Sequence, residues 1–157
     1  MYKIGLVEDE IALNNLIKDY LEKESFEVIT FTKGQDTLDY IENNNDIKLW
    51  ILDIMLEDEI TGYDIIKEIR KRDEQIPIIF SSARDESIDK IMGLELGGDD
   101  YIAKPYSPRE LVLRVKNIVK RVYSNDFNKI QYNDYEIDTE KRTVSGKNEN
   151  IELTTLE

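Results

Sequence analysis

The stretch LWILDIMLED, residues 49–58, decides how this sequence is interpreted. Five of its first six residues are apolar, as in a strand buried in a core, yet Asp53 stands near the end of the run. An ionised carboxylate beside apolar side chains is unfavourable unless another group offsets its charge. The sequence therefore predicts a strand whose last residue is a carboxylate with a specific task.

Segments of two kinds alternate on both sides of this stretch. Short apolar segments predict strands at 2–7, 26–31, 48–53, 76–82 and 100–104. Apolar residues at helical spacing predict helices at 11–24, 35–44, 63–73, 85–98 and 107–123. Strict alternation of five strand–helix units predicts an α/β fold with a doubly wound, five-stranded parallel sheet and helices on both faces.

Several apolar side chains are expected to face the core. Trp50 and Met92 are interpreted as packing residues. In the first helix the expected inward residues are Ile11, Leu13, Leu16, Ile17, Tyr20 and Leu21. In the last helix, which begins with the capping signal Ser107–Pro108 and Glu110, they are Leu111, Val115, Ile118, Val119 and Val122.

The pattern changes after residues 124–128. Segments KIQY, YEID, RTVS and IELT alternate apolar and polar residues, which predicts small antiparallel strands. Thr154 and Glu157 have the spacing of a capping box, so a helix is expected to begin where the sequence ends. A few short strands seldom form a core without a helix to cover them. We therefore expect a second domain that is truncated.

Composition excludes several classes of chemistry. The chain of 157 residues has no cysteine and no histidine, which excludes disulfides, thiolate sites and the Ser-His-Asp triad. With 34 acidic and 21 basic residues its net charge is −13, which suits divalent cations better than nucleic acid. No apolar run approaches the roughly 20 residues that span a bilayer. The first residues lack a secretory signal, so a cytoplasmic protein is expected.

Charged and polar residues gather at the expected carboxyl ends of the strands, where ligands bind in such sheets. Glu8 and Asp9 follow the first strand, Asp53 ends the third, Ser82 the fourth, and Lys104 the fifth. Three carboxylates repel one another unless a cation joins them, and Mg²⁺ prefers oxygen ligands. Asp53, between the acidic pair and the lysine, is the candidate nucleophile for a phosphoryl group. Lys104 and the Ser82 hydroxyl would stabilise the transferring oxygens.

Four motifs carry a resemblance to a known family. The segments VEDE (7–10), LDIML (52–56), SAR (82–84) and GGDDYIAKPYSPREL (97–111) resemble the receiver domain of two-component response regulators. The tail resembles the opening sheet of the winged-helix effector of the OmpR/PhoB type. The resemblance implies a flavodoxin-like sheet of order 2-1-3-4-5, with a receiver domain at 1–123, a linker at 124–129 and part of a DNA-binding domain at 130–157.

The resemblance also implies roles for single residues. Asp53 matches the phospho-acceptor. Mg²⁺, or Mn²⁺ as a substitute, would be bound by Glu8, Asp9, Asp53 and the Met55 carbonyl. Ser82 matches the hydroxyl that follows the phosphate, and Tyr101 matches the aromatic side chain that moves with that hydroxyl. Lys104 matches the lysine that pairs with the phosphate, and its peptide bond to Pro105 is expected to be cis. One departure stands out: Glu57 replaces a usual proline and Gly62 comes one residue late, so EDEIT lengthens an acidic loop beside the metal site.

The implied function is a phosphorylation switch that controls transcription in the full-length protein. Because the chain has no histidine, its phosphohistidine donor is expected on another protein, a sensor histidine kinase or a relay domain. The fourth helix, fifth strand and last helix form the expected homodimer face. Complementary charges there are Asp99, Asp100, Arg114 and Lys116. DNA binding is expected only with the missing recognition helix, and the chain is not expected to be an enzyme.

Other interpretations remain open. Glu8 could cap the first helix, Ser81 could replace Ser82, and Tyr101 could be an ordinary strand aromatic. A receiver-like module that binds partners without phosphorylation is one alternative function. A magnesium-dependent phosphatase is another, although such an enzyme usually has a second aspartate where this chain has Met55.

Overall fold

The computed structural model describes residues 1–83, 87–123, 129–132, 135–138, 143–146 and 149–152, with side chains described up to Tyr123 except at 84–87. The chain forms two compact units, Met1–Arg114 and Val115–Glu157. In the described part, no helix is both long and apolar enough to cross a membrane.

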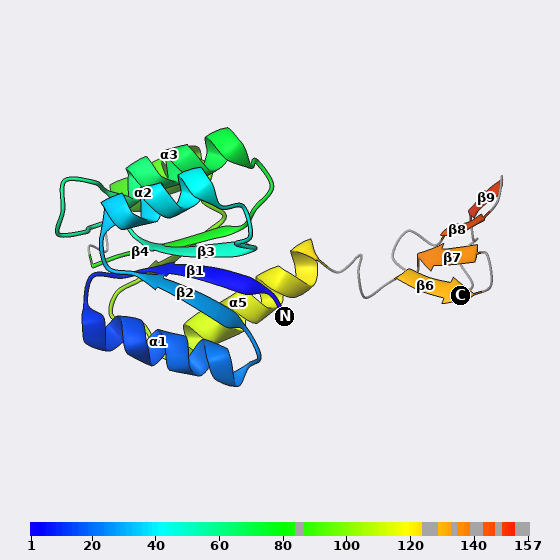
Figure 1. Cartoon of the computed structure of the whole chain (residues 1–157), viewed down its shortest axis with the longest axis horizontal. Coiled ribbons are helices and arrows are strands. Elements are labelled where there is room, and N and C mark those ends of the chain that lie inside the picture. The colour runs from blue at the N-terminus through cyan, green and yellow to red at the C-terminus, as the bar shows by residue number, and fades with distance from the viewer. Residues whose placement is uncertain (84–86, 124–128, 133–134, 139–142, 147–148, 153–157) are drawn as a thin grey trace. The chain divides into compact units, whose positions relative to one another are not determined.

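The first unit is built on a five-stranded parallel sheet (Figure 1). Its strands lie in the order β2-β1-β3-β4-β5, which confirms the flavodoxin-like topology. Helices α2 and α3 cover one face, and α1 and the first half of α5 lie on the other. The strands are β1 Lys3–Val7, β2 Glu27–Phe31, β3 Leu49–Asp53, β4 Ile78–Ser82 and β5 Asp100–Ala103.

The five helices fall where the sequence predicts them. They are α1 Ile11–Lys23, α2 Gly34–Asn43, α3 Gly62–Arg72, α4 Ser87–Glu95 and α5 Pro108–Val122. The start expected for the fourth helix, 85–86, lies outside the described residues. Helix α3 begins with a reciprocal capping box between Thr61 and Asp64, which satisfies backbone donors at its first turn.

Four expected inward residues are exposed instead. In α1, Ile11 and Leu16 are 66% and 44% exposed, because Ile11 is the first residue of the helix and the buried face follows Asn14, Ile17 and Leu21. Met92 in α4 and Val122 at the last position of α5 are also exposed. Apolar spacing located the helices but not the edges of their buried faces.

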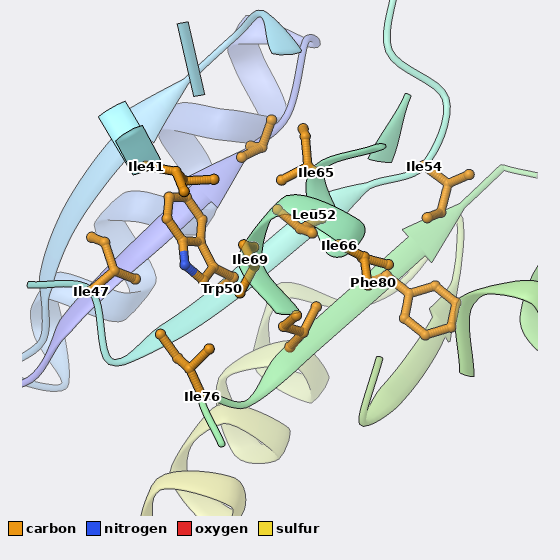
Figure 2. Packing of buried hydrophobic residues seen from close by; sticks show 12 residues of the cluster. Ile41, Ile47, Trp50, Leu52, Ile54, Ile65, Ile66, Ile69, Ile76 and Phe80 are labelled. Carbon is orange, nitrogen blue, oxygen red and sulfur yellow. The ribbon is translucent and has the colours of Figure 1, made fainter. Parts of the chain in front are cut away.

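The core on the α2–α3 face is continuous along β3 and β4 (Figure 2). Trp50 is buried as predicted, and its ring lies against Gly5, where an added Cβ would come within 2.4 Å of it. Phe80 is fully buried between Gly93 and Gly98, which leave room for its ring. Each such side chain contributes roughly 2 kcal/mol of burial free energy, so this face supplies a large share of the fold's stability.

The second unit contains four short strands that form an antiparallel sheet. They are β6 Lys129–Tyr132, β7 Tyr135–Asp138, β8 Thr143–Gly146 and β9 Glu149–Glu152, in sequential order. Antiparallel pairing agrees with the alternating pattern of the tail. The helix expected from Thr154 and most of the expected linker lie outside the described residues.

Candidate functional site

Parallel register brings the ends of the central strands together. Val7 pairs with Leu52, and Asp53 pairs with Ser81 on the next strand. Glu8 and Asp9, which directly follow β1, therefore lie beside Asp53 at the end of β3. On the other side, Ser82 pairs with Ala103, and Lys104 follows directly after β5. The residues that the sequence predicts for one site thus meet at one edge of the sheet.

Three carboxylates form the acidic part of this site. Glu8, Asp9 and Asp53 each offer an oxygen, and these oxygens lie within 4.8 Å of one another. Glu8 is 1% exposed and Asp53 is 4% exposed, whereas Asp9 is half-buried. This all-oxygen donor set, partly open to solvent, fits a hard divalent cation such as Mg²⁺, which binds a few carboxylates and retains water.

Lys104 supplies the positive charge of the site. Its Nζ contacts Glu8 Oε1 closely and lies 3.0 Å from Asp53 Oδ2. The other oxygens of the two acids accept backbone hydrogen bonds, Glu8 Oε2 from Glu10 N at 3.1 Å and Asp53 Oδ1 from Met55 N at 3.0 Å. One lysine thus faces two buried carboxylates, and the described cluster keeps an excess of negative charge.

Burial and neighbouring charges shift the pKa values of these groups. Burial, together with the negative charge of Asp53, raises the pKa of Glu8 to about 7, despite the hydrogen bond from Lys104. Burial likewise raises the pKa of Asp53, and the nearby Asp9 adds to that effect. Burial alone would lower the pKa of Lys104, but Glu8 and Asp53 outweigh it and the pKa is raised. An added cation would relieve this repulsion.

Ser82 and Tyr101 lie on neighbouring strands beside this cluster. Ser82 is fully buried, and its Oγ donates a hydrogen bond to Asp89 Oδ2 at 3.1 Å. Tyr101 is half-buried, with its ring 5.3 Å from that of Phe80. The Lys104–Pro105 peptide bond, which the resemblance implies is cis, is cis in the structure.

The loop after β3, which the resemblance predicts to be lengthened, is held by two hydrogen bonds. Asp58 Oδ2 accepts a hydrogen bond from Gln35 N at the start of α2, and Gly62 N donates to Ile54 O at 2.9 Å. Gly62 is confined: a Cβ there would come within 2.5 Å of the Asp53 carbonyl oxygen. Met55, the expected source of a carbonyl ligand, is 44% exposed at its side chain.

Three polar residues near the site were not singled out from the sequence. Asn14 is buried in α1 and its amide donates to the carbonyls of Glu8 and Phe31, which holds the chain where the acidic pair begins. Tyr106 has a raised pKa because of burial and the negative charges of Glu8 and Asp53. Asp89 is buried in α4. Asn14 could have been found because it is a polar residue on the apolar face of a predicted helix. No pattern in the neighbouring sequence indicated Tyr106 or Asp89.

Three of the four charged residues of the expected dimer face, Asp99, Asp100 and Arg114, are paired within the chain. Arg70 Nη2 lies 2.9 Å from Asp99 Oδ2, which also accepts a hydrogen bond from Ile78 N. Arg114 Nη1 lies 2.9 Å from Asp100 Oδ1. Pairing of these side chains across a dimer would therefore require exchange of existing ion pairs.

A cavity of about 550 Å³ lies at the other end of the sheet. It opens between the last turns of α2 and α3, beside the residues that precede β4, and its floor includes Trp50 and Ile69. None of the acidic residues of the strand ends lines it. We assign the functional site from the converging buried charges, because the charged residues that line the cavity, Glu42, Arg72 and Asp73, are exposed.

Comparison with known proteins gives one consistent result. The family described as the response regulator receiver domain matches residues 4–116. The transcriptional regulatory protein CssR of Bacillus subtilis is 46% identical over 154 residues, which is 96% of this chain and 67% of CssR. Response regulator SaeR of Staphylococcus aureus is 41% identical over 78% of this chain, which spans only 52% of SaeR.

Among solved structures, the response regulator DrrB of Thermotoga maritima, described as an OmpR/PhoB homologue, superposes with a TM-score of 0.69. It is 27% identical in sequence, and the match covers 98% of this chain and 67% of DrrB. The matches to CssR and DrrB cover 96% and 98% of this chain, so they include both the parallel sheet and the antiparallel tail.

Proposed function

This chain belongs to the response regulator receiver family, and from that premise we propose that Asp53 accepts a phosphoryl group from the phosphohistidine of a sensor kinase. One Asp53 oxygen would attack phosphorus, the phosphorus–nitrogen bond would break, and the electron pair would leave with the donor imidazole. The observation that carries the proposal is the burial of Asp53 against Lys104 within 4.8 Å of two further carboxylates.

The side chains of the site have distinct parts in this reaction. Glu8, Asp9 and Asp53 would hold Mg²⁺, with the Met55 carbonyl as a further ligand; when bound, the ion would neutralise charge on phosphoryl oxygens. Lys104 already lies 3.0 Å from the Asp53 carboxylate and would pair with the phosphate. The buried Ser82 hydroxyl would donate to a phosphoryl oxygen after a change of rotamer, and Tyr101 would move with it.

The proposed output is control of transcription through a second domain. CssR is named a transcriptional regulatory protein, and its similarity covers 96% of this chain. We place the receiver domain at 1–123, a linker at 124–129 and the opening strands of a winged-helix domain at 130–157, where β6 to β9 form an antiparallel sheet. Homodimerisation through α4, β5 and α5, and a cytoplasmic location, belong to the same proposal.

Intact mass spectrometry after incubation with acetyl phosphate and MgCl₂ tests the acceptor. The wild-type chain is expected to gain one phosphoryl group, and Asp53→Asn none. The exposed Asp36→Asn is the matched control and should behave as wild type. Equal phosphorylation of Asp53→Asn would overturn the assignment. Repeated turnover of a small phosphoester would instead indicate a phosphatase, and an unmodified chain would favour a module that works without phosphorylation.

A further inference from the structure

Helix α4 carries a buried carboxylate that contacts two other elements. Asp89 is 9% exposed, whereas other described residues of this helix such as Ile88, Ile91 and Met92 are 65%, 52% and 43% exposed. Its Oδ2 accepts the Ser82 hydroxyl of β4 at 3.1 Å, and its Oδ1 accepts the Tyr63 hydroxyl of α3 at 3.1 Å. One carboxylate therefore joins a strand and two helices.

The Ser82 hydroxyl has a single proton to donate. In this structure it donates that proton to Asp89. A phosphoryl group offers only acceptor oxygens, so Ser82 can hydrogen-bond to it only by giving up Asp89. The two acceptors, one on α4 and one on phosphorylated Asp53, compete for the same donor.

Loss of the Ser82 donor would destabilise the present position of α4. Asp89 would keep its hydrogen bond from Tyr63, but Oδ2 would lose a buried partner, which is unfavourable unless the helix shifts or water enters. The apolar side chains of α4 are 41% to 65% exposed, so Gly93 against Phe80 and the contacts of Asp89 are the buried contacts that such a shift would change. The hydroxyl of Tyr63 matters here because it fixes the position of the carboxylate that Ser82 contacts.

We propose that Asp89 is a positioning residue that holds the Ser82 hydroxyl in the unphosphorylated chain, with the Tyr63 hydroxyl fixing Asp89 for that purpose. The proposal rests on the proposed function, because the Asp89 contact matters only if a phosphoryl group on Asp53 competes with Asp89 for the Ser82 hydroxyl. Weakening the contact favours the phosphorylated conformation, whereas loss of an ordinary structural contact would not.

The molecule offers a matched control for this test. Tyr40 and Asp46 form a second tyrosine–aspartate pair, with the Tyr40 hydroxyl 2.7 Å from Asp46 Oδ1. This pair lies at the end of α2 and contacts Lys3 rather than Ser82. Tyr40→Phe and Asp46→Asn therefore remove equivalent groups without touching the proposed contact.

The experiment is a titration of the full chain with beryllium fluoride, a phosphoryl mimic, at fixed MgCl₂, followed by amide NMR signals of α4. Asp89→Asn is expected to lower the midpoint concentration about tenfold, as when a competing hydrogen bond to a charged group is weakened. Tyr63→Phe is expected to lower it about threefold. The control variants should stay within about twofold of wild type.

Unchanged or higher midpoints for Asp89→Asn and Tyr63→Phe, with a wild-type chain that does bind the mimic, would overturn this inference alone. A wild-type chain that neither binds beryllium fluoride nor gains a phosphoryl group would overturn the proposed function, and this inference with it. Should Asp89→Asn fail to fold, the smaller change Tyr63→Phe decides the outcome.

Discussion

The two ends of β3 differ in what they contribute. At Trp50 to Leu52 the strand is filled with apolar side chains that are fully or almost fully buried. One residue later, Asp53 is buried to a similar degree but among other carboxylates, with a raised pKa. The first region stabilises the fold, whereas the second holds charges that repel one another. A single strand thus anchors the core and presents a reactive group, and substitutions should affect the two ends in different ways.

The largest effect is expected in the apolar region. Leu52→Ala removes most of a fully buried side chain and should lower the free energy of unfolding by about 4 kcal/mol, through lost burial and the cavity left behind. Urea denaturation measures this change. The control is Met55→Ala, whose side chain is 44% exposed and whose loss should change stability by at most about 0.5 kcal/mol. Similar losses of unfolding free energy in Leu52→Ala and Met55→Ala would contradict the view that the apolar part of β3 stabilises the fold.

Removal of the lysine in the charged region comes next. Lys104→Met should lower the free energy of unfolding by about 3 kcal/mol at pH 7.5, because Glu8 and Asp53 lose their common partner while buried. The loss should shrink at pH 5, where Glu8 is protonated. Lys71→Met, at a position 74% exposed, is the control. An equal effect of both substitutions would show that Lys104 does not offset buried charge.

The charged end should also give the protein a specific pH dependence without metal. The pKa of Glu8 is raised in the folded chain from 4.5 to about 7, so between these values the folded chain binds more protons than the unfolded one. Stability should therefore fall as pH rises through this window, by roughly 3 kcal/mol.

Urea denaturation at several pH values in the presence of EDTA measures this slope. Glu8→Gln should flatten it, and the exposed Glu22→Gln should leave it in place. A slope that survives in Glu8→Gln would assign the linkage to other groups.

A smaller effect is expected from a polar contact near the site that carries no buried charge. The Thr61 hydroxyl caps α3 by accepting a hydrogen bond from the Asp64 backbone N–H. In return, the Asp64 carboxylate accepts one from the Thr61 backbone N–H. Thr61→Ala should lower stability by about 1 kcal/mol, measured by thermal unfolding, and the exposed Thr32→Ala should change little. A larger loss would indicate that the loop after β3 depends on the cap more than its contacts suggest.

The sequence was sufficient to predict the strands, their parallel arrangement and the gathering of charged residues at their carboxyl ends, because these follow from periodicity and from the geometry of parallel sheets. The strand order 2-1-3-4-5 was implied only by the resemblance to receiver domains. The sequence was insufficient for Asp89 and Tyr106, which lie near the site through tertiary packing. The exposure of Ile11, Leu16 and Met92 was missed for a similar reason. Helical spacing identifies an apolar face, but neighbouring elements decide how much of it is covered.

The charged residues of the expected dimer face show a further limit of the sequence. Their order in the sequence suggested pairing between chains, yet Asp99 and Asp100 already pair with Arg70 and Arg114 in the same chain. Arg70 lies 29 residues before Asp99 in the sequence, on α3. A long-range ion pair of this kind has no local signature, so it could be recognised only once α3 and the start of β5 were placed side by side.

The central claim is that the acidic end of the sheet is unfavourable alone and is relieved by a cation. The free energy of unfolding of wild type and Asp53→Asn, measured by urea denaturation at pH 7.5 with and without MgCl₂, tests it most directly. Without Mg²⁺, Asp53→Asn should be at least as stable as wild type, because it removes one of the repelling carboxylates. With Mg²⁺, wild type should gain clearly more stability than the variant. Equal stabilisation of both chains, or none, would contradict the account.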